Sequence, residues 1–236
     1  MKPSLGAVLS FNGGYVDTAG FIALQGLFTA HVTGNFVTIG SALIFGTSGV
    51  VAKLLALPVF CLVVIVTRLA SFHLPQNRTA LNTMLLVKLA LLLLGAYFAV
   101  HWGPFQNGDS WAALSTGMTF VAAMAIQNAI HRIHLSAAPP TTLMTGTTTQ
   151  IMIDVADAIR GLSADTRAAT LLRMRRMVTA VLLFASGAAA AALLFKSVGV
   201  LCFLVPPLVA IAAILVAKAA DSTAPPVVSP APTTPR

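Results

Sequence analysis

Residues 81–102 read LNTMLLVKLALLLLGAYFAVHW, and this stretch decides the class of fold. Apart from Lys88 it contains no Asp, Glu, Lys or Arg. A helix of about 20 mostly apolar residues is long enough to cross the hydrocarbon core of a bilayer. The stretch therefore predicts a membrane-crossing helix.

Five further segments have the same character, so the sequence predicts about six membrane spans. Apolar residues make up 57% of the 236-residue chain and charged residues 8%, whereas soluble domains carry roughly a quarter charged residues. This composition excludes an ordinary soluble enzyme, a disordered chain and a coiled coil. It predicts an all-α polytopic transmembrane helical bundle. The five further segments are Leu5–Leu24, Val50–Phe72, Trp111–Ile130, Met177–Phe195 and Val198–Ala217.

The distribution of charge predicts how these spans are oriented. Cytoplasmic loops of membrane proteins are enriched in Lys and Arg. If six spans cross and the N-terminus is inside, only Lys53 and Lys196 of the 14 Lys and Arg residues lie outside. We therefore expect both termini in the cytoplasm, and we attribute the net charge of +8 to topology and not to nucleic-acid binding. Residues 1–217 are then one transmembrane domain, and residues 218–236, rich in Pro, Ala and Thr, are a disordered cytoplasmic tail.

Two stretches, Leu27–Phe45 and Thr141–Ile159, are too polar for lipid-facing spans and too apolar for plain loops. Each contains a Thr-Gly pair: the first reads HVTGN over residues 31–35, and the second reads LMTGT over residues 143–147. Irregular backbone at membrane depth is tolerated only where it is buried in protein or lines a wet cavity. The stretches are therefore either re-entrant or broken segments, or interfacial loops with ordinary glycine turns.

The two stretches also predict an internal repeat. Asp17 precedes the first Thr-Gly pair by 16 residues, and Asn128 precedes the second by 17 residues. Each stretch is followed by two further apolar segments, so the chain divides into halves of about residues 5–102 and 111–217. With three spans in each half, the second half is inverted relative to the first. Inverted repeats are common in transporters, whose sites lie near the midplane where the repeats meet.

The motifs GYVDTAG at residues 14–20 and HVTGN at residues 31–35 resemble the YoaK-like family, domain of unknown function 1275. The motifs QNA at residues 127–129 and MTGT at residues 144–147 support the resemblance, which covers roughly residues 5–217. It implies a multi-pass protein of the bacterial inner membrane. It implies no substrate, no reaction and no functional residues.

The polar residues around the two Thr-Gly pairs are the candidate substrate-binding residues. A carboxylate deep in a bilayer is costly, so Asp17, twelve residues into the first span, is expected to face the protein interior. His31 is either a proton-relay residue or a loop residue bonded to backbone. The amide side chains either bind a solute or join helices. The full set is Asp17, His31, Thr33, Gly34, Asn35, Gln127, Asn128, Thr145 and Gly146.

Two groups of basic residues have simpler interpretations. The long side chain of Lys88 is expected to reach the cytoplasmic surface rather than to pair with Asp17. Residues 163–176 are expected to form a basic helix on the inner membrane surface. Its three clustered arginines, Arg173, Arg175 and Arg176, would contact anionic lipid headgroups.

The sequence contains no recognised catalytic, phosphate-binding or metal-ligand motif, so it predicts no enzyme, no metal and no cofactor. The leading hypothesis is a transporter or channel for a small solute, because of the repeat and the intramembrane Asp17. The alternative is a non-transporting membrane scaffold or accessory protein, which the small-residue surface at residues 187–192 and the basic inner loop favour. The expected partners are the lipid bilayer and an unidentified small solute.

Overall fold

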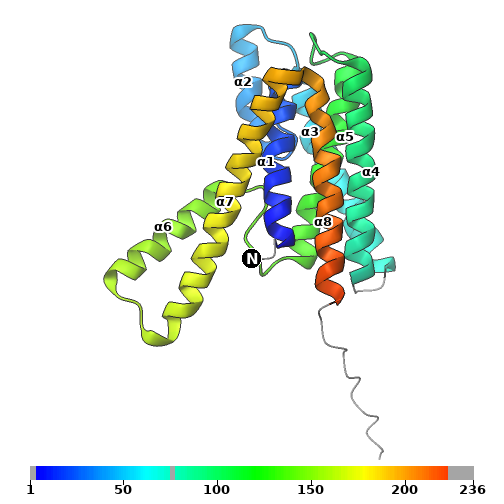
Figure 1. Ribbon diagram of the computed structural model, residues 1–236. Coiled ribbons are helices and arrows are strands. Elements are labelled where there is room, and N and C mark those ends of the chain that lie inside the picture. The colour runs from blue at the N-terminus through cyan, green and yellow to red at the C-terminus, as the bar shows by residue number, and fades with distance from the viewer. Residues whose placement is uncertain (1–3, 75–77, 223–236) are drawn as a thin grey trace, which may run out of the picture.

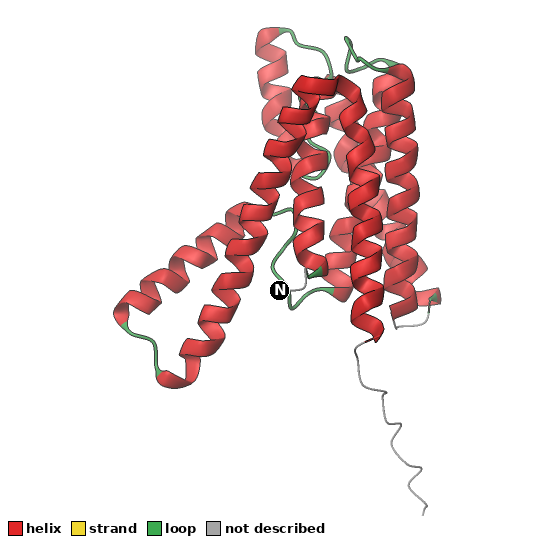
Figure 2. Cartoon of the chain, in the orientation of Figure 1, coloured by secondary structure: helices red, strands yellow, loops and turns green. Residues whose placement is uncertain are grey.

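The computed structural model describes residues 4–74 and 78–222, which form an all-α structure (Figure 1, Figure 2). Two short 3-10 helices, η1 and η2, adjoin the α-helices. The helices are α1 (Leu5–Ala23), η1 (Val32–Gly34), α2 (Asn35–Phe45), α3 (Val50–His73), α4 (Arg78–Trp102), α5 (Trp111–His134), α6 (Met144–Arg160), α7 (Ala164–Val198), η2 (Gly199–Leu204) and α8 (Val205–Ser222).

Every segment that the sequence predicts as a span is helical, but the predicted count of six spans is not established. Four segments are long and apolar enough to cross a membrane, namely Val50–His73, Thr79–Trp102, Trp111–His134 and Asp165–Ala219. The last contains both α7 and α8, which are joined through η2 at Gly199, where a φ of 58° reverses the chain. Among the described helices α1 is not one of the four, and its buried polar residues, Asn12 and Asp17, account for its lower hydropathy.

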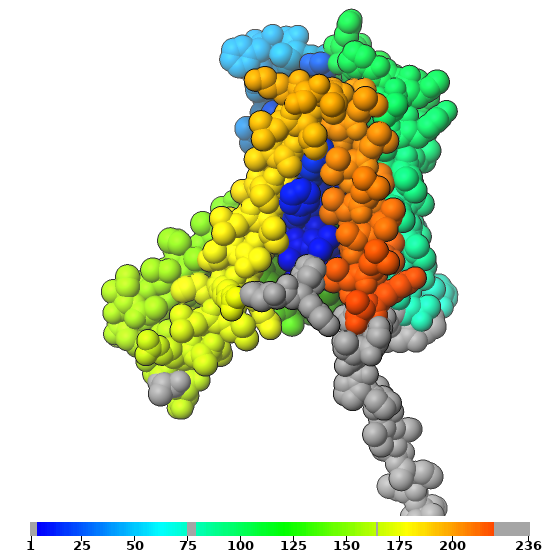
Figure 3. Space-filling model, in the orientation of Figure 1, coloured from blue at the N-terminus to red at the C-terminus, as the bar shows by residue number. Residues whose placement is uncertain are grey.

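The helices pack as two sets of three. In one set α1 lies between α7 and α8, and Figure 3 shows α1 exposed in the gap between them. In the other set α5 packs against α3 and α4, and α4 packs against α8 to join the sets. Apolar side chains fill the junction: the rings of Phe120 and Phe203 stack with centroids 4.9 Å apart, and the Tyr15 hydroxyl donates to the Cys202 carbonyl at 2.9 Å.

Glycines bring α1 and α7 into backbone contact. A Cβ atom at Gly14 would meet the carbonyl of Phe184 on α7, and one at Gly187 would meet the carbonyl of Phe11 on α1. Small residues allow such close approach between membrane helices. Gly187 and Ala191, four residues apart on the small-residue surface, are thus buried within the bundle against α1. One face of the small-residue surface therefore serves packing within the chain.

The start of α3 is held by the loop that connects the two halves. The Asp109 carboxylate accepts hydrogen bonds from the backbone N–H groups of Gly49 at 2.9 Å, Val50 at 3.1 Å and Ala52 at 3.1 Å. Because α5 begins at Trp111, directly after this loop, α3 and α5 start at the same end of the bundle. They pack together and run in the same direction.

The helix α6 and the first half of α7 form an arm that projects from the bundle (Figure 1). The buried Asp154 carboxylate joins the two helices, because it accepts from Arg173 Nη2 at 2.7 Å, from Arg173 Nε at 3.1 Å and from Gln150 at 2.9 Å. Residues 164–176 are helical, as the sequence predicts, but they are not a separate element, since they begin the 35-residue α7. Arg173, which was expected to contact lipid headgroups, forms an ion pair with Asp154 at 2.7 Å.

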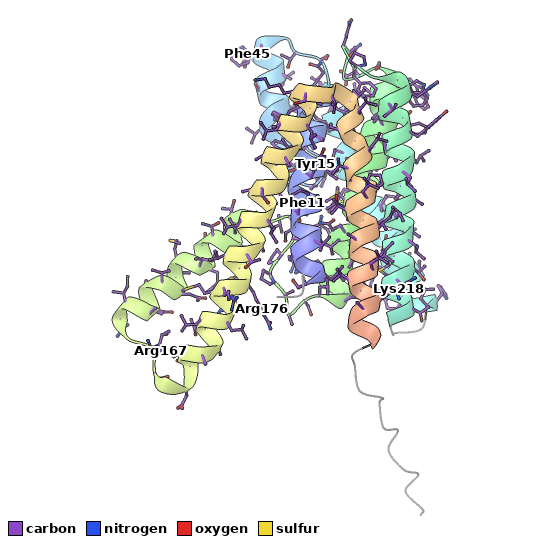
Figure 4. The ribbon with its side chains drawn as sticks, in the orientation of Figure 1. Phe11, Tyr15, Phe45, Arg167, Arg176 and Lys218 are labelled. Atoms are coloured by element: carbon purple, nitrogen blue, oxygen red, sulfur yellow. The ribbon has the colours of Figure 1, made fainter. Side chains whose placement is uncertain are left out.

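The chain end differs from the predicted boundary. The helix α8 continues through Lys218 to Ser222, past the expected start of the tail. Figure 4 shows Lys218 and Phe45 at opposite ends of the bundle. The rest of the predicted disordered tail, residues 223–236, lies outside the described residues.

Candidate functional site

The segment between α1 and η1 folds back along α1. At its start, the Gln25 side chain donates to the carbonyl of Phe105 at 3.0 Å, so Gln25 lies beside the connecting loop at one end of the bundle. Further along, the backbone N–H groups of Thr29 and Ala30 reach Asp17. Asp17 precedes the end of α1, Ala23, by six residues, so the segment returns about 9 Å along the helix axis.

Asp17 is the residue that holds this first loop in place. Its Oδ1 atom accepts from the backbone N–H groups of Thr29 and Ala30, both at 2.8 Å, and of His31 at 3.4 Å. Its Oδ2 atom lies 3.6 Å from His31 Nδ1. The carboxylate is buried and faces the protein interior, as the sequence predicts. Asn35 closes the same loop, because its amide both accepts from the N–H and donates to the carbonyl of Phe28, each at 2.9 Å.

The segment between α5 and α6 folds back along α5 in the same way. Gln127 Nε2 donates to the Thr141 hydroxyl at 3.1 Å, and the Thr142 hydroxyl donates to Asn128 Oδ1 at 2.8 Å. Gln127 precedes the end of α5, His134, by seven residues, which corresponds to a return of about 10 Å. The two loops therefore reach matching depths along their own helices.

A cavity of about 740 Å³ lies where the two loops approach α3 and α5. The first loop and η1 contribute His31 and Thr33, and the second loop contributes Leu143. The two helices contribute one face each, at i, i+4 spacing. The full lining is Ala30, His31, Val32, Thr33, Phe60, Val64, Arg68, Asn128, Ala129, Arg132, Ile133 and Leu143.

The charged groups of the cavity lie toward one end. Arg68 follows Phe60 by eight residues on α3, or about 12 Å, and Arg132 follows Asn128 by four residues on α5, or about 6 Å. Because the two helices run in the same direction, both arginines are displaced toward the same end of the bundle. The Arg68 guanidinium lies 4.4 Å from the ring centroid of Phe72, a cation–π contact. No Asp or Glu lines the described cavity.

The predicted site residues separate into three groups in the structure. His31, Thr33 and Asn128 line the cavity. Asp17, Asn35 and Gln127 support the loops from behind, and Gly34 packs against the Phe28 ring. Thr145 and Gly146 lie in the first turn of α6, are exposed and do not line the cavity.

Lys88 does not reach the surface, contrary to the prediction. Its side chain is fully buried, and Nζ donates to Gln127 Oε1 at 2.5 Å. Gln127 also donates to the Leu9 carbonyl at 2.9 Å. One amide thus joins α1, α4, α5 and the second loop, and it has no free group to offer a solute.

Sequence reasoning missed Arg68 and Arg132, which it assigned to membrane topology alone. One signal was available for Arg132: it follows Asn128 by four residues, so both share a helix face. Within the described residues, no group of three or more His, Cys, Asp or Glu side chains is arranged to hold a metal ion.

Comparison with curated proteins and with solved structures finds no match for this chain. Comparison with protein families finds a match. The model of the DUF1275 family, described as a protein of unknown function, matches residues 5–217, which include α1, both loops, the cavity and nearly all of α8. The chain therefore belongs to the DUF1275 family.

Proposed function

We propose that this protein is a transporter or channel for a small solute. One observation carries the proposal: one cavity is lined by a loop from each half of the chain, through His31 of the first loop and Leu143 of the second. Sites where two repeats meet are characteristic of transporters. The lining supplies groups for recognition, namely guanidinium, imidazole, hydroxyl and amide.

The packing supports an inverted repeat of three spans in each half. The neighbours of α5 are α3 and α4 from the first half, and the neighbours of α1 are α7 and α8 from the second half. Each central helix thus packs against two helices of the other half, α1 matching α5, α3 matching α7, and α4 matching α8. The loop after each central helix returns to a polar side chain, Asp17 or Gln127, at a similar depth. We interpret these loops as re-entrant segments and α1 as a sixth span, packed between α7 and α8.

The positions of the arginines favour a cavity that faces the cytoplasm. Arg68 and Arg132 lie toward the ends of α3 and α5 that the positive-inside rule assigns to the cytoplasm. The start of α1 lies at this end too, since a Cβ atom at Gly6 would contact Ala138, which follows α5. We therefore propose a plasma-membrane protein with both termini inside. Asn107→Cys should be labelled by an impermeant thiol reagent from outside, and Arg167→Cys should not, so the reverse result would overturn this orientation.

We propose transport rather than catalysis or scaffolding. A substitution that fills the cavity with a larger side chain tests this proposal. Val64 lines the cavity, whereas Val66, two residues later on the same helix, is 55% exposed on the outer face. Untargeted comparison of uptake and efflux should identify solutes whose movement depends on the protein. Val64→Trp should abolish that movement, and the matched Val66→Trp should not. If no solute depends on the protein, or if both variants transport equally, the proposal fails.

A further inference from the structure

We infer that the cavity takes a small organic anion, with its anionic group at Arg68 and Arg132 and its apolar body against Phe60, Val64 and Leu143. This inference rests on the proposed function, since it names the class of solute. It is carried by two observations: both charged residues in the described lining are arginines, and apolar side chains form much of the rest of the lining.

The charge of the cavity is positive. Two guanidinium groups, one from α3 and one from α5, line it, and among the described lining residues no carboxylate offsets them. Within the described part of the chain neither Arg68 nor Arg132 forms an ion pair with Asp or Glu. The Asp17 carboxylate lies behind the lining, where backbone N–H groups and His31 occupy its oxygens. A cleft lined by one sign of charge concentrates ligands of the opposite sign.

The guanidinium groups suit an oxyanion in particular. Arginine presents several N–H donors in a planar fork that matches a carboxylate or phosphate. Arg68 and Arg132 come from α3 and α5, which pack together, so both arginines line the same cavity.

The rest of the lining selects an anion that carries an apolar body. Phe60, Val64, Ile133 and Leu143 form an apolar part of the lining, beside the arginines and the polar group of His31, Thr33 and Asn128. A cavity of about 740 Å³ holds a solute of several carbon atoms. A bare inorganic ion would leave this apolar wall without contact. The polar group at the other end offers a hydroxyl and an amide for a second polar substituent.

The test measures charge selectivity without knowing the solute. Val64→Cys is made in a Cys61→Ser background, because Cys61 is the exposed native cysteine and Cys202 is buried. An anionic and a cationic methanethiosulfonate reagent of similar size are then compared on the purified protein. The anionic reagent should react about tenfold faster or more. Replacing both arginines with Gln should bring the rate ratio close to that of free cysteine.

A matched control separates local charge from net charge. Arg167 lies at the far end of the arm (Figure 4), so Arg167→Gln removes one positive charge at a distance from the cavity and is compared with Arg68→Gln and Arg132→Gln made singly. It should leave the rate ratio unchanged. A ratio that favours the cationic reagent, or one that survives loss of both cavity arginines, would overturn the inference.

Protection of the same introduced cysteine identifies the ligand class. With a neutral thiol reagent, benzoate should slow modification at millimolar concentration, and benzyl alcohol and benzylammonium should slow it less. This order should vanish in the doubly substituted Arg68→Gln, Arg132→Gln protein. Equal protection by all three probes would contradict the inference.

The anionic group of a membrane lipid has the same chemistry, so the experiment is repeated in vesicles. Phosphatidylcholine vesicles are compared with vesicles that contain phosphatidylglycerol. If a soluble anion is the ligand, benzoate protects the Val64→Cys thiol in both. If phosphatidylglycerol alone blocks this thiol and benzoate has no effect, the cavity binds a lipid headgroup and the inference fails. If the cavity selects anionic reagents but the protein moves no solute, the proposed transport function is refuted. If the protein transports a cation and the cavity shows no preference for anionic reagents, only the inference of an anionic solute is refuted.

Discussion

Replacing Asp17 tests whether one buried carboxylate holds the first loop at depth. Asp17→Ala leaves the buried N–H groups of Thr29 and Ala30 without their acceptor, which lies 2.8 Å away in the wild type. Each unsatisfied buried donor costs about 1–3 kcal/mol, so the pair costs about 2–6 kcal/mol. Because about 1.4 kcal/mol corresponds to a factor of ten, the lower value already opens the loop about 30-fold more often.

The Asp17→Asn variant separates shape from charge. It keeps an acceptor oxygen of the same shape but loses the charge that faces His31. Hydrogen bonds to charged groups contribute about 1.5–3 kcal/mol, and neutral ones about 0.5–1.5 kcal/mol, so weakening both bonds in Asn should cost about 2–3 kcal/mol. We expect it to reduce transport while membrane insertion and abundance stay near the wild-type level.

Hydrogen exchange of the purified protein, followed by mass spectrometry, measures loop opening directly. Exchange over residues 28–31 should accelerate strongly in Asp17→Ala and less in Asp17→Asn. Asp157→Ala is the control, because Asp157 is exposed on α6. If residues 28–31 exchange at the wild-type rate in Asp17→Ala, Asp17 does not hold the loop and the reasoning is refuted.

Three further predictions concern the frame around the cavity. Gly14→Ala should prevent assembly of the folded bundle, measured by size-exclusion chromatography, because its Cβ meets the backbone of α7, whereas Gly40→Ala, with open space around it, should assemble normally. Asp109→Ala should lower the free energy of unfolding by about 1–2 kcal/mol through loss of the α3 cap, seen as a lower Tm, and an unchanged Tm would contradict the capping role. The Arg173 guanidinium lowers the pKa of the Asp154 carboxyl from its usual 3.8, so the pair stabilises the arm above about pH 4 and loses this effect as the pH falls through the lowered pKa. Arg173→Gln should therefore expose the arm to trypsin at neutral pH, and resistance equal to the wild type would exclude this role.

The apolar helices could be predicted from sequence because bilayer thickness fixes their length. The predicted Leu5–Leu24 and Val50–Phe72 differ by one residue each from α1 and α3. The prediction fails at one boundary: residues 163–176 and the span from Met177 were expected as two elements, but they form the single helix α7. The packing of the first half of α7 against α6 through Asp154 was not predicted. Contact with another helix leaves no signal in local hydropathy.

The cavity could be predicted only in part, because spacing identifies polar residues but not their partners. His31 and Asn128 were found from their places beside the loops. Asn35 has the same polar character, yet both of its side-chain groups bind the backbone of Phe28. Arg68 and Arg132 were missed because the positive-inside rule already explained them. An arginine that the positive-inside rule explains can also line a cavity. Only the direction of its side chain shows whether it has this second role.

The two loops are held by chemically different groups, and this asymmetry has a consequence for motion. In the first loop an ionised side chain, Asp17, binds two backbone N–H groups. In the second loop the corresponding bonds join the neutral amides Gln127 and Asn128 to threonine hydroxyls. Since charge-assisted hydrogen bonds are roughly twice as strong as neutral ones, the second loop should open at a lower free energy than the first.

If the halves rearrange around a bound solute, the loop that opens first should therefore be the one that carries Leu143. Its backbone amides should exchange faster than those of residues 28–31 in the same protein. Asp17→Asn replaces the carboxylate with an amide and weakens the hydrogen bonds of the first loop alone. It should therefore reduce the difference in exchange rate between the two loops. Faster exchange in the first loop of the wild type would show that hydrogen-bond strength does not set the order of opening. The order would then have to come from the helices that carry the loops, of which α1 is packed backbone to backbone against α7 at Gly14 and Gly187.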